Sequence, residues 1–147
     1  MKEPAARAVT PSASIYAMKP TSTHKLLLWC AAMDSTFEPS IVGAERALTG
    51  KCIHCRTRVS VSLHGKPIGG ASLEHIVPRT HGGTNALDNL AIACTRCNAQ
   101  KGTRLDARRR DDPTLQAVID TLRARRLERL RAPLAALALP AVPPAER

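Results

Sequence analysis

The sequence predicts a small α+β fold whose core is held together by a metal ion and flanked by helices at both ends. Two Cys-x-x-Cys pairs, Cys52/Cys55 and Cys94/Cys97, place four thiols in the middle of the chain. Residues 59–63 alternate apolar and polar with a period of two, which is typical of a half-buried strand. Residues 115–130 carry Leu, Val and Ile at helical spacing.

The composition favours a polyanionic partner. The 147 residues contain 22 Lys and Arg against 12 Asp and Glu, a net charge of +10. Composition alone would fit a membrane surface or a ribosome equally well. The three aromatic residues, Tyr16, Trp29 and Phe37, all precede Cys52. From Lys51 onward the chain therefore has neither an aromatic-rich core nor the aromatic platforms on which single-strand-binding proteins stack bases.

The N-terminal part divides into a leader and a helical extension. Residues 1–22 are rich in Ala, Pro, Ser and Thr and lack a periodic apolar pattern, so they are expected to be a disordered leader. Within the helical extension, residues 23–50, we expect a helix over 23–33 with Thr23 as its N-cap. A short helical turn is expected over 43–48.

The apolar run at 26–32 allows a second interpretation as a signal peptide. The run is at the short end of the range for a signal-peptide core, and no clear cleavage site follows it. It is also too short to span a bilayer. A helix in a cytoplasmic protein without membrane contact is therefore the expectation.

Residues 51–104 are expected to form the central domain. Its predicted elements are a strand at 59–63, a turn at 64–67, a returning strand at 71–75, a loop at 78–88, a strand at 90–93 and a short helix that ends at Gly102.

Residues 105–131 are predicted to form a basic helix that begins at Asp112-Pro113-Thr114. Two interpretations of this helix stay open: its apolar stripe packs on the domain while its arginines are solvated, or its arginines lie along DNA phosphates. Residues 132–147 are rich in Ala, Leu and Pro and are expected to be a frayed tail. The stripe comprises Leu115, Val118, Ile119, Leu122 and Leu130, and the arginines are Arg123, Arg125, Arg126, Arg129 and Arg131.

Four of the five cysteines have the arrangement of a structural zinc site. Each Cys-x-x-Cys turn supplies two thiolates to a tetrahedral ion, and the 38 residues between the pairs imply an inserted substructure. Disulfides and a redox pair are the alternatives, but neither a secretory signal nor a thioredoxin-like βαβ pattern is visible. Cys30 is expected to be a buried small apolar residue, and His54 a bystander because four thiolates complete the tetrahedron. One structural Zn²⁺ is therefore expected on Cys52, Cys55, Cys94 and Cys97.

The stretch between the cysteine pairs carries the residue types of metal-assisted nuclease chemistry. Phosphodiester hydrolysis needs a base for water, a hard divalent cation at the phosphate, and a group that orients the base. Carboxylate and amide oxygens suit Mg²⁺ or Mn²⁺. The stretch reads Glu74-His75-Ile76-Val77-Pro78-Arg79, His81-Gly82-Gly83, Asn85, Asp88-Asn89-Leu90, Cys94-Thr95-Arg96-Cys97-Asn98 and Lys101-Gly102.

These motifs resemble those of the HNH endonucleases with the ββα-metal fold, in their four-cysteine zinc subtype. His75 and Asn89 are 14 residues apart, and Asn89 and Asn98 are nine apart, as in that family. The resemblance covers about residues 51–102. Asn98 stands where the third letter of the namesake pattern has His, giving an HNN variant, and Glu74 stands where many members have Asp.

The resemblance implies a role for each matched residue. His75 would be the general base, and Asn89 would fix the loop and orient His75. Glu74 and Asn98 would hold one catalytic divalent cation, Mg²⁺ or another such as Mn²⁺. Possible contacts to the phosphate backbone are Arg79, His81, Arg96 and Lys101.

The resemblance therefore implies a metal-dependent endonuclease that hydrolyses DNA, with duplex DNA as the expected partner. A non-catalytic zinc-binding module that binds nucleic acid is one alternative, and a nuclease directed at RNA is another. A degenerate copy usually loses one of the site residue types, so the complete set argues against the first alternative. That set is Glu74, His75, Asn89 and Asn98.

Overall fold

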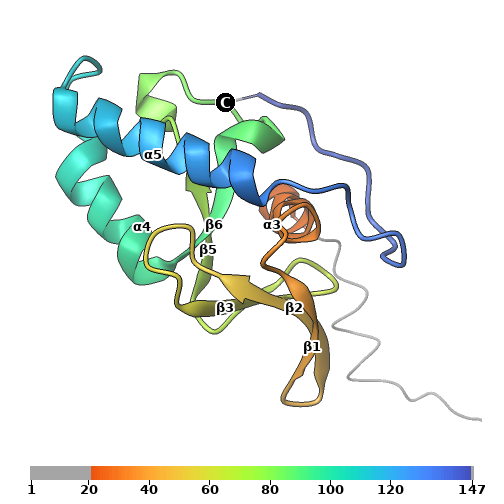
Figure 1. Ribbon diagram of the computed structural model, residues 1–147. Coiled ribbons are helices and arrows are strands. Elements are labelled where there is room, and N and C mark those ends of the chain that lie inside the picture. The colour runs from red at the N-terminus through yellow and green to blue at the C-terminus, as the bar shows by residue number, and fades with distance from the viewer. Residues whose placement is uncertain (1–20, 147) are drawn as a thin grey trace, which may run out of the picture.

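The computed structural model describes residues 21–146, so the predicted leader lies outside the described residues except for its last two. The described part combines two small antiparallel sheets with helices, which confirms the predicted α+β class (Figure 1). Short 3-10 turns at Arg79–His81 and Leu87–Asn89 interrupt the loop between β5 and β6, and a π-helical turn at Gly102–Asp106 follows α4. In chain order the elements are α3 (Ser22–Ala32), β1 (Glu38–Val42), β2 (Glu45–Lys51), β3 (Arg58–Ser62), β4 (Pro67–Ile68), β5 (Ala71–His75), β6 (Leu90–Cys94), α4 (Thr95–Lys101) and α5 (Pro113–Arg129).

The first sheet has the strand order β1-β2-β3-β4. Its β1–β2 hairpin stands where we expected a helical turn over 43–48, so that prediction is wrong. Gly43 has a φ of +63°, which suits a tight hairpin turn, and Val42 pairs with Glu45 across it. β2 also pairs with β3, which buries Leu48 in the core. Pairing on both sides of β2 outweighs the helical preference of its Ala and Leu residues.

The second sheet consists of β5 and β6. The strand predicted at 71–75 is present as β5, but the strand that returns along β3 is β4. Gly69 and Gly70 have φ values of +64° and +83°, and these left-handed residues turn the chain out of the first sheet before β5 begins. In the β5–β6 register, Glu74 lies opposite Ala91 and His75 opposite Leu90.

Helix α3 confirms the helix predicted over 23–33, although its N-cap is Thr21 rather than Thr23. The Thr21 hydroxyl accepts a hydrogen bond from the His24 amide at 3.1 Å. The apolar run at 26–32 is buried against both sheets, apart from the partly exposed Trp29. Within residues 21–146, no helix has the length and apolarity needed to cross a bilayer.

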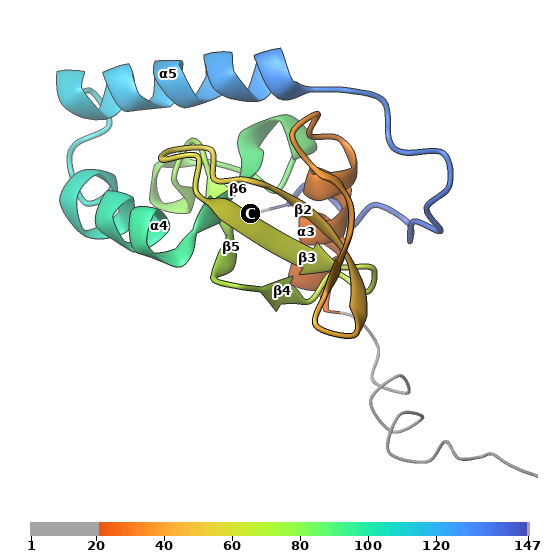
Figure 2. The same ribbon diagram turned by 60° about the horizontal axis from the view of Figure 1, so that its bottom comes forward.

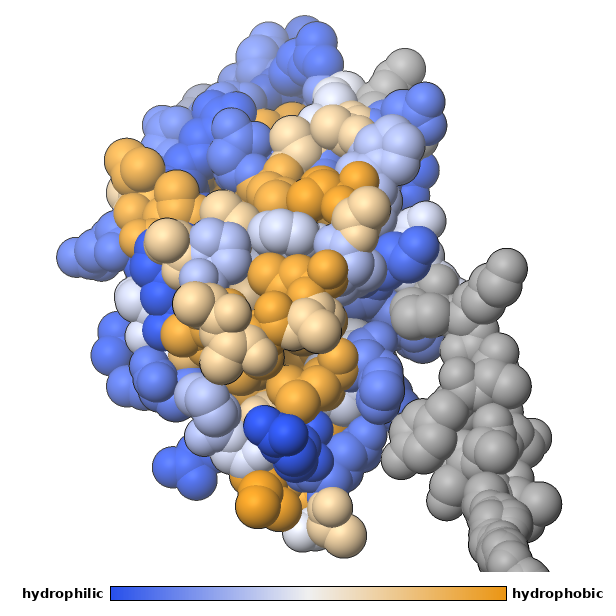
Figure 3. Space-filling view, turned by 90° about the vertical axis from the view of Figure 1, so that its right-hand side faces the viewer, coloured by the Kyte–Doolittle hydropathy of each residue, from blue (hydrophilic) through white to orange (hydrophobic). Residues whose placement is uncertain are grey.

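The chain beyond α5 has no regular structure over most of its length, but it packs on the domain instead of fraying. Trp29 Nε1 donates to the carbonyl oxygen of Pro140 at 2.8 Å. Leu134, Leu137 and Leu139 are partly buried against the core. Figure 3 views the side of the molecule that carries α3 and this tail, and apolar side chains gather there.

Helix α5 lies over the rest of the domain as an outer layer (Figure 2). It begins as predicted, because Asp112 Oδ1 accepts from the Thr114 and Leu115 amides at 2.9 and 3.1 Å. Leu115 and two further members of the predicted stripe are buried. Leu130 is 40% exposed, because the helix ends at Arg129.

The arginines of α5 do not form one solvated or DNA-facing surface, and this corrects the sequence-based expectation. Arg126 and Arg129 are buried. Arg125 and Arg129 donate to the carbonyl oxygens of residues 51–54 at 2.9–3.4 Å, and Arg129 lies 3.7 Å from the buried Asp34 carboxylate. The helix therefore holds the backbone of the first cysteine pair through its arginines as well as packing through its apolar stripe.

Two buried arginines one helical turn apart are expected to have opposite effects on stability. Arg129→Met removes donors from two carbonyls and leaves Asp34 as a buried unpaired charge, so we expect the free energy of unfolding to fall by about 3 kcal/mol. Within the described residues, Arg126 Nε and Nη1 are buried without hydrogen-bond partners, and Nη2 makes only a long bond, 3.5 Å, to the Leu87 carbonyl. Arg126→Met keeps most of the volume and removes these donors, so it should leave stability unchanged or raise it by about 1 kcal/mol. Urea unfolding of both variants checks this, and equal destabilisation by the two would contradict it.

Candidate active site

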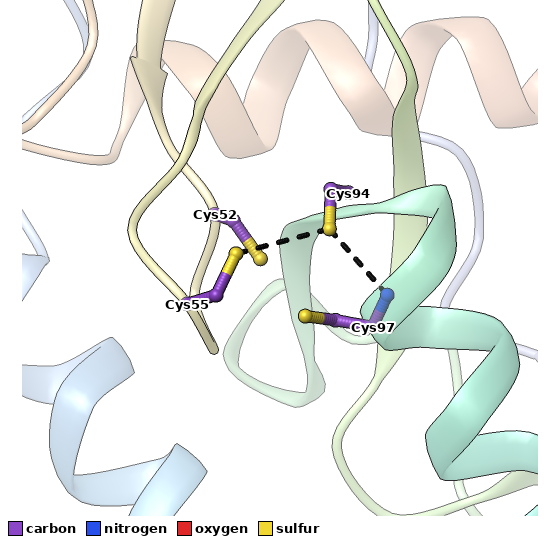
Figure 4. Close-up of side chains that lie close together, drawn as sticks. All are labelled: Cys52, Cys55, Cys94 and Cys97. Carbon is purple, nitrogen blue, oxygen red and sulfur yellow. Dashed lines mark hydrogen bonds between the residues drawn. The ribbon is translucent and has the colours of Figure 1, made fainter.

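The four thiols of the two cysteine pairs converge at one point. We call residues 52–55 the first cysteine turn, residues 94–97 the second, and their four thiols the four-cysteine cluster. The sulfur atoms all lie within 4.8 Å of one another (Figure 4). Backbone amides of the two turns donate to sulfur, with His54 N 3.3 Å from Cys52 Sγ and Cys97 N 3.4 Å from Cys94 Sγ. All described cysteines are free thiols, so the cluster can hold a metal ion such as zinc.

Two thiols of the cluster have pKa values shifted in opposite directions. A hydrogen bond from the Thr57 backbone lowers the pKa of Cys55 to about 6, whereas burial raises the pKa of Cys97 to about 12. A bound cation would let all four ionise, and metal binding would release protons. Cys30 lies apart on α3, where burial raises its pKa to about 11, in agreement with its predicted apolar role.

Glu74 is a buried carboxylate, only 1% exposed. Its Oε1 lies 2.6 Å from His54 Nε2, and its Oε2 lies 3.0 Å from Lys101 Nζ. The ammonium of Lys101 also donates to Asp106 Oδ1 at 2.9 Å and to the His75 carbonyl at 3.0 Å. We expected Lys101 near a phosphate, but here it is 3% exposed and its ammonium contacts groups of the protein itself.

Asn98 lies on α4 and faces β5, the strand that carries Glu74. Its Nδ2 donates to Ser72 Oγ at 3.0 Å and to the Leu73 carbonyl at 2.9 Å. Ser72 and Glu74 are two residues apart on β5 and so share one face of the strand. Glu74 and Asn98 therefore meet the same β5–α4 interface, although no hydrogen bond joins them within residues 21–146.

His75 points away from Glu74, as neighbouring residues on a strand do. Its Nε2 lies 2.7 Å from Asn85 Oδ1 in the loop between β5 and β6. An amide oxygen can only accept, so Nε2 carries the proton and a neutral imidazole keeps Nδ1 as its basic atom.

Asn89 binds the loop that follows His75. Its Oδ1 accepts from the Val77 amide at 2.9 Å, while its Nδ2 donates to the carbonyls of Val77 and Thr84 at 3.2 and 2.9 Å. Its own carbonyl accepts from the Ile76 amide at 2.9 Å. These bonds hold the backbone next to His75, whereas the imidazole itself is contacted by Asn85.

Glycine is required at positions 82 and 83 of this loop for two different reasons. Gly82 has a φ of +87°, which is the turn role that the sequence predicts. Gly83 is needed because a Cβ there would lie 1.8 Å from the Val77 carbonyl oxygen. Both allow the loop to fold back tightly on the residues after β5.

Besides Lys101, three residues were predicted to contact phosphate. Arg79 is exposed at the start of the loop. His81 Nε2 lies 3.1 Å from the Asp106 carbonyl oxygen. Arg96 is exposed beside the four-cysteine cluster, where a hydrogen bond to Cys55 raises its pKa. Of the four predicted phosphate contacts, Lys101 is the one that pairs with Glu74.

Sequence reasoning missed three contacts in this region. His54 does not ligate the cluster, as expected, but it is bonded to Glu74. Asn85 stands in the motif region without an assigned role, and Asp106 lies outside the predicted domain. No spacing rule identifies them, because each contact depends on how a turn or loop folds back.

Comparison with known protein families matches residues 52–114 to the HNH endonucleases. This range contains both cysteine turns, β5, β6 and α4, and it excludes α3, the β1–β2 hairpin and nearly all of α5. No curated protein and no solved structure matches the chain.

Proposed function

We propose that this chain is a metal-dependent endonuclease that hydrolyses DNA, because residues 52–114 match the family model of the HNH endonucleases. The proposal is carried by the arrangement of residues where strand β5 packs on helix α4, which we call the β5–α4 unit. It places a buried carboxylate, Glu74, and the amide of Asn98 in one interface, with His75 next along the strand. The net charge of +10 suits a phosphodiester substrate.

The donor set of this unit fits a hard divalent cation. Among residues 21–146, no group donates a hydrogen bond of good geometry to the buried Glu74 Oε2, and none donates to Asn98 Oδ1. Lys101 Nζ pairs with Oε2 at 3.0 Å, so the carboxylate faces a positive charge here, and a metal ion at Oε2 would take the place of that ammonium. We propose that Glu74 and Asn98 hold Mg²⁺ or Mn²⁺. When bound, such an ion supplies charge stabilisation at the phosphate and at the departing oxygen.

His75 is the proposed general base. Asn85 keeps the proton on Nε2, so that Nδ1 can take a proton from water as the water oxygen attacks phosphorus. A bond forms between the water oxygen and phosphorus, and the bond from phosphorus to the 3′-oxygen breaks. The products are a 5′-phosphate and a 3′-hydroxyl. Asn89 acts on this step indirectly, by holding the backbone after His75.

Loss of the Asn85 acceptor is expected to reduce cleavage without unfolding the protein. Asn85→Leu has a similar volume but leaves the imidazole free to change tautomer and to rotate, so the cleavage rate should fall by about 10-fold or more. Asn85→Asp keeps an acceptor oxygen and should remain within about threefold of wild type. Single-turnover cleavage of an end-labelled duplex measures both. Equal rates for Asn85→Leu and wild type would contradict the assigned tautomer.

We propose that the four-cysteine cluster holds one Zn²⁺ with a structural role. Four thiolates would complete a tetrahedral shell and leave no position for substrate. The ion would join the turn after β2 to the start of α4, and so would hold together the two parts of the chain that carry His54 and Asn98.

A substrate panel tests the proposed activity. The zinc-loaded protein is incubated with duplex DNA, single-stranded DNA or RNA of the same sequence, with Mg²⁺ or Mn²⁺ added. We expect metal-dependent cleavage of duplex DNA. Binding without cleavage of any substrate would indicate a non-catalytic module, and cleavage of RNA alone would indicate an RNA-directed nuclease.

A further inference from the structure

His54 lies inside the first cysteine turn, yet its side chain leaves the four-cysteine cluster and reaches Glu74. The His54 Nε2 to Glu74 Oε1 distance is 2.6 Å, and the imidazole is 18% exposed. No other hydrogen bond to Glu74 Oε1 is formed among the described residues. The contact therefore links a metal-binding turn to the carboxylate that we propose as a ligand of the catalytic cation.

The backbone around His54 is held from several sides. The His54 amide donates to Cys52 Sγ at 3.3 Å, and the His54 carbonyl accepts from Arg125 Nη1 at 3.2 Å. The neighbouring Ile53 amide donates to the Ile92 carbonyl on β6 at 3.0 Å. A side chain that starts from so constrained a backbone can hold its partner in one orientation.

The two carboxylate oxygens of Glu74 have different interactions. Oε1 is hydrogen-bonded to His54, whereas Oε2 forms an ion pair with Lys101 Nζ at 3.0 Å and accepts no hydrogen bond of good geometry from the part of the chain that the structure describes. His54 and Lys101 both line a hollow of about 360 Å³ between α4 and α5, which Glu74 itself does not line. Its partners thus separate the carboxylate from that hollow.

We propose that His54 is a positioning residue for the catalytic cation: it donates from Nε2 to Glu74 Oε1, so that Oε2, which pairs with Lys101 in this structure, is the oxygen that would bind the ion once Lys101 moves aside. The proposal rests on the proposed function, since it assumes that Glu74 binds a cation. Hydrogen bonds to a ligating carboxylate typically contribute about 10- to 100-fold in metal affinity. The first cysteine turn thereby serves two metal sites: its thiols bind one ion, and its histidine orients a ligand of the other.

Binding of Mn²⁺ to the zinc-loaded full chain, without DNA, tests this. His54→Leu removes the donor and should weaken Mn²⁺ binding by about 10-fold or more. His54→Gln keeps an N–H donor of similar reach and should remain within about threefold of wild type. His54→Asn is polar but too short to reach Oε1, so it should behave as His54→Leu. Zinc content and circular dichroism are measured on every variant, and His64→Leu, in an exposed turn, is the matched control.

The outcomes separate this proposal from the proposed function. If His54→Leu and His54→Asn keep zinc and bind Mn²⁺ as tightly as wild type, the positioning role is wrong while the nuclease assignment stands. If His54→Leu loses zinc, the comparison of His54→Asn with His54→Gln decides, and equal Mn²⁺ affinity of these two overturns the role. If wild type and Glu74→Gln bind Mn²⁺ equally, Glu74 is not a ligand, and both proposals fail.

Discussion

Replacement of His75 by alanine is expected to lower the DNA-cleavage rate by about 100-fold or more, which is the usual contribution of a general base. The imidazole is fixed by Asn85 on one nitrogen, and its other nitrogen is the basic atom. Alanine removes that base, and the nearby His54 is already bonded to Glu74. The fold should persist, because the His75 side chain is only partly buried.

Supercoiled-plasmid nicking under single-turnover conditions measures the His75→Ala effect. The matched control is His64→Ala, which removes an exposed imidazole from the turn between β3 and β4. Both variants should retain zinc and the wild-type circular dichroism spectrum. Cleavage by His75→Ala at the rate of the control would show that another group activates water.

Loss of one cluster thiol is expected to unfold the domain. Structural zinc contributes about 10–16 kcal/mol of apparent binding free energy in small zinc domains at neutral pH. This chain has a small core without aromatic residues beyond Lys51, and that core cannot replace such a contribution. Cys52→Ser and Cys94→Ser should therefore lose zinc together with regular structure.

Metal content per chain and thermal unfolding check the effect of these two substitutions. Cys30→Ala is the control, because Cys30 is equally buried but lies outside the cluster. It should keep one zinc per chain and unfold cooperatively, at a somewhat lower temperature. If Cys52→Ser and Cys94→Ser remain folded with full zinc, the cluster does not have a structural role.

Local signals made the central domain predictable. The period-two pattern at 59–63 and the apolar run at 90–93 depend on burial of one strand face or both, which the sequence displays directly. The start of α5 was predictable from Asp112 and Pro113, because capping is a contact between residues close together in the chain.

Tertiary contacts decided what could not be predicted. The β1–β2 hairpin depends on pairing of β2 with β3, which no local preference reveals. The buried positions of Arg126 and Arg129 are equally non-local, because their surroundings are residues 34–52 and 87, far away in the chain. An arginine-rich helix face looks solvated until the backbone carbonyls beneath it are known.

The candidate site shows the same division. Glu74, His75 and Asn98 were identified from motif spacing, and the structure places Glu74 and Asn98 at one interface. The contacts of His54 and Asn85 depend on where a cysteine turn and a glycine loop direct their side chains. Those directions follow from the fold and not from spacing along the chain.

Metal-dependent nicking of supercoiled DNA by the wild-type protein tests the central claim most directly. The protein is loaded with zinc, freed of other divalent ions, and assayed with and without added Mg²⁺ or Mn²⁺. We predict nicking only with added cation, no nicking by Glu74→Gln, and ends that carry a 5′-phosphate and a 3′-hydroxyl. A folded, zinc-loaded protein that binds DNA but never cuts it with either cation, or that cuts equally well without one, would contradict the proposed mechanism.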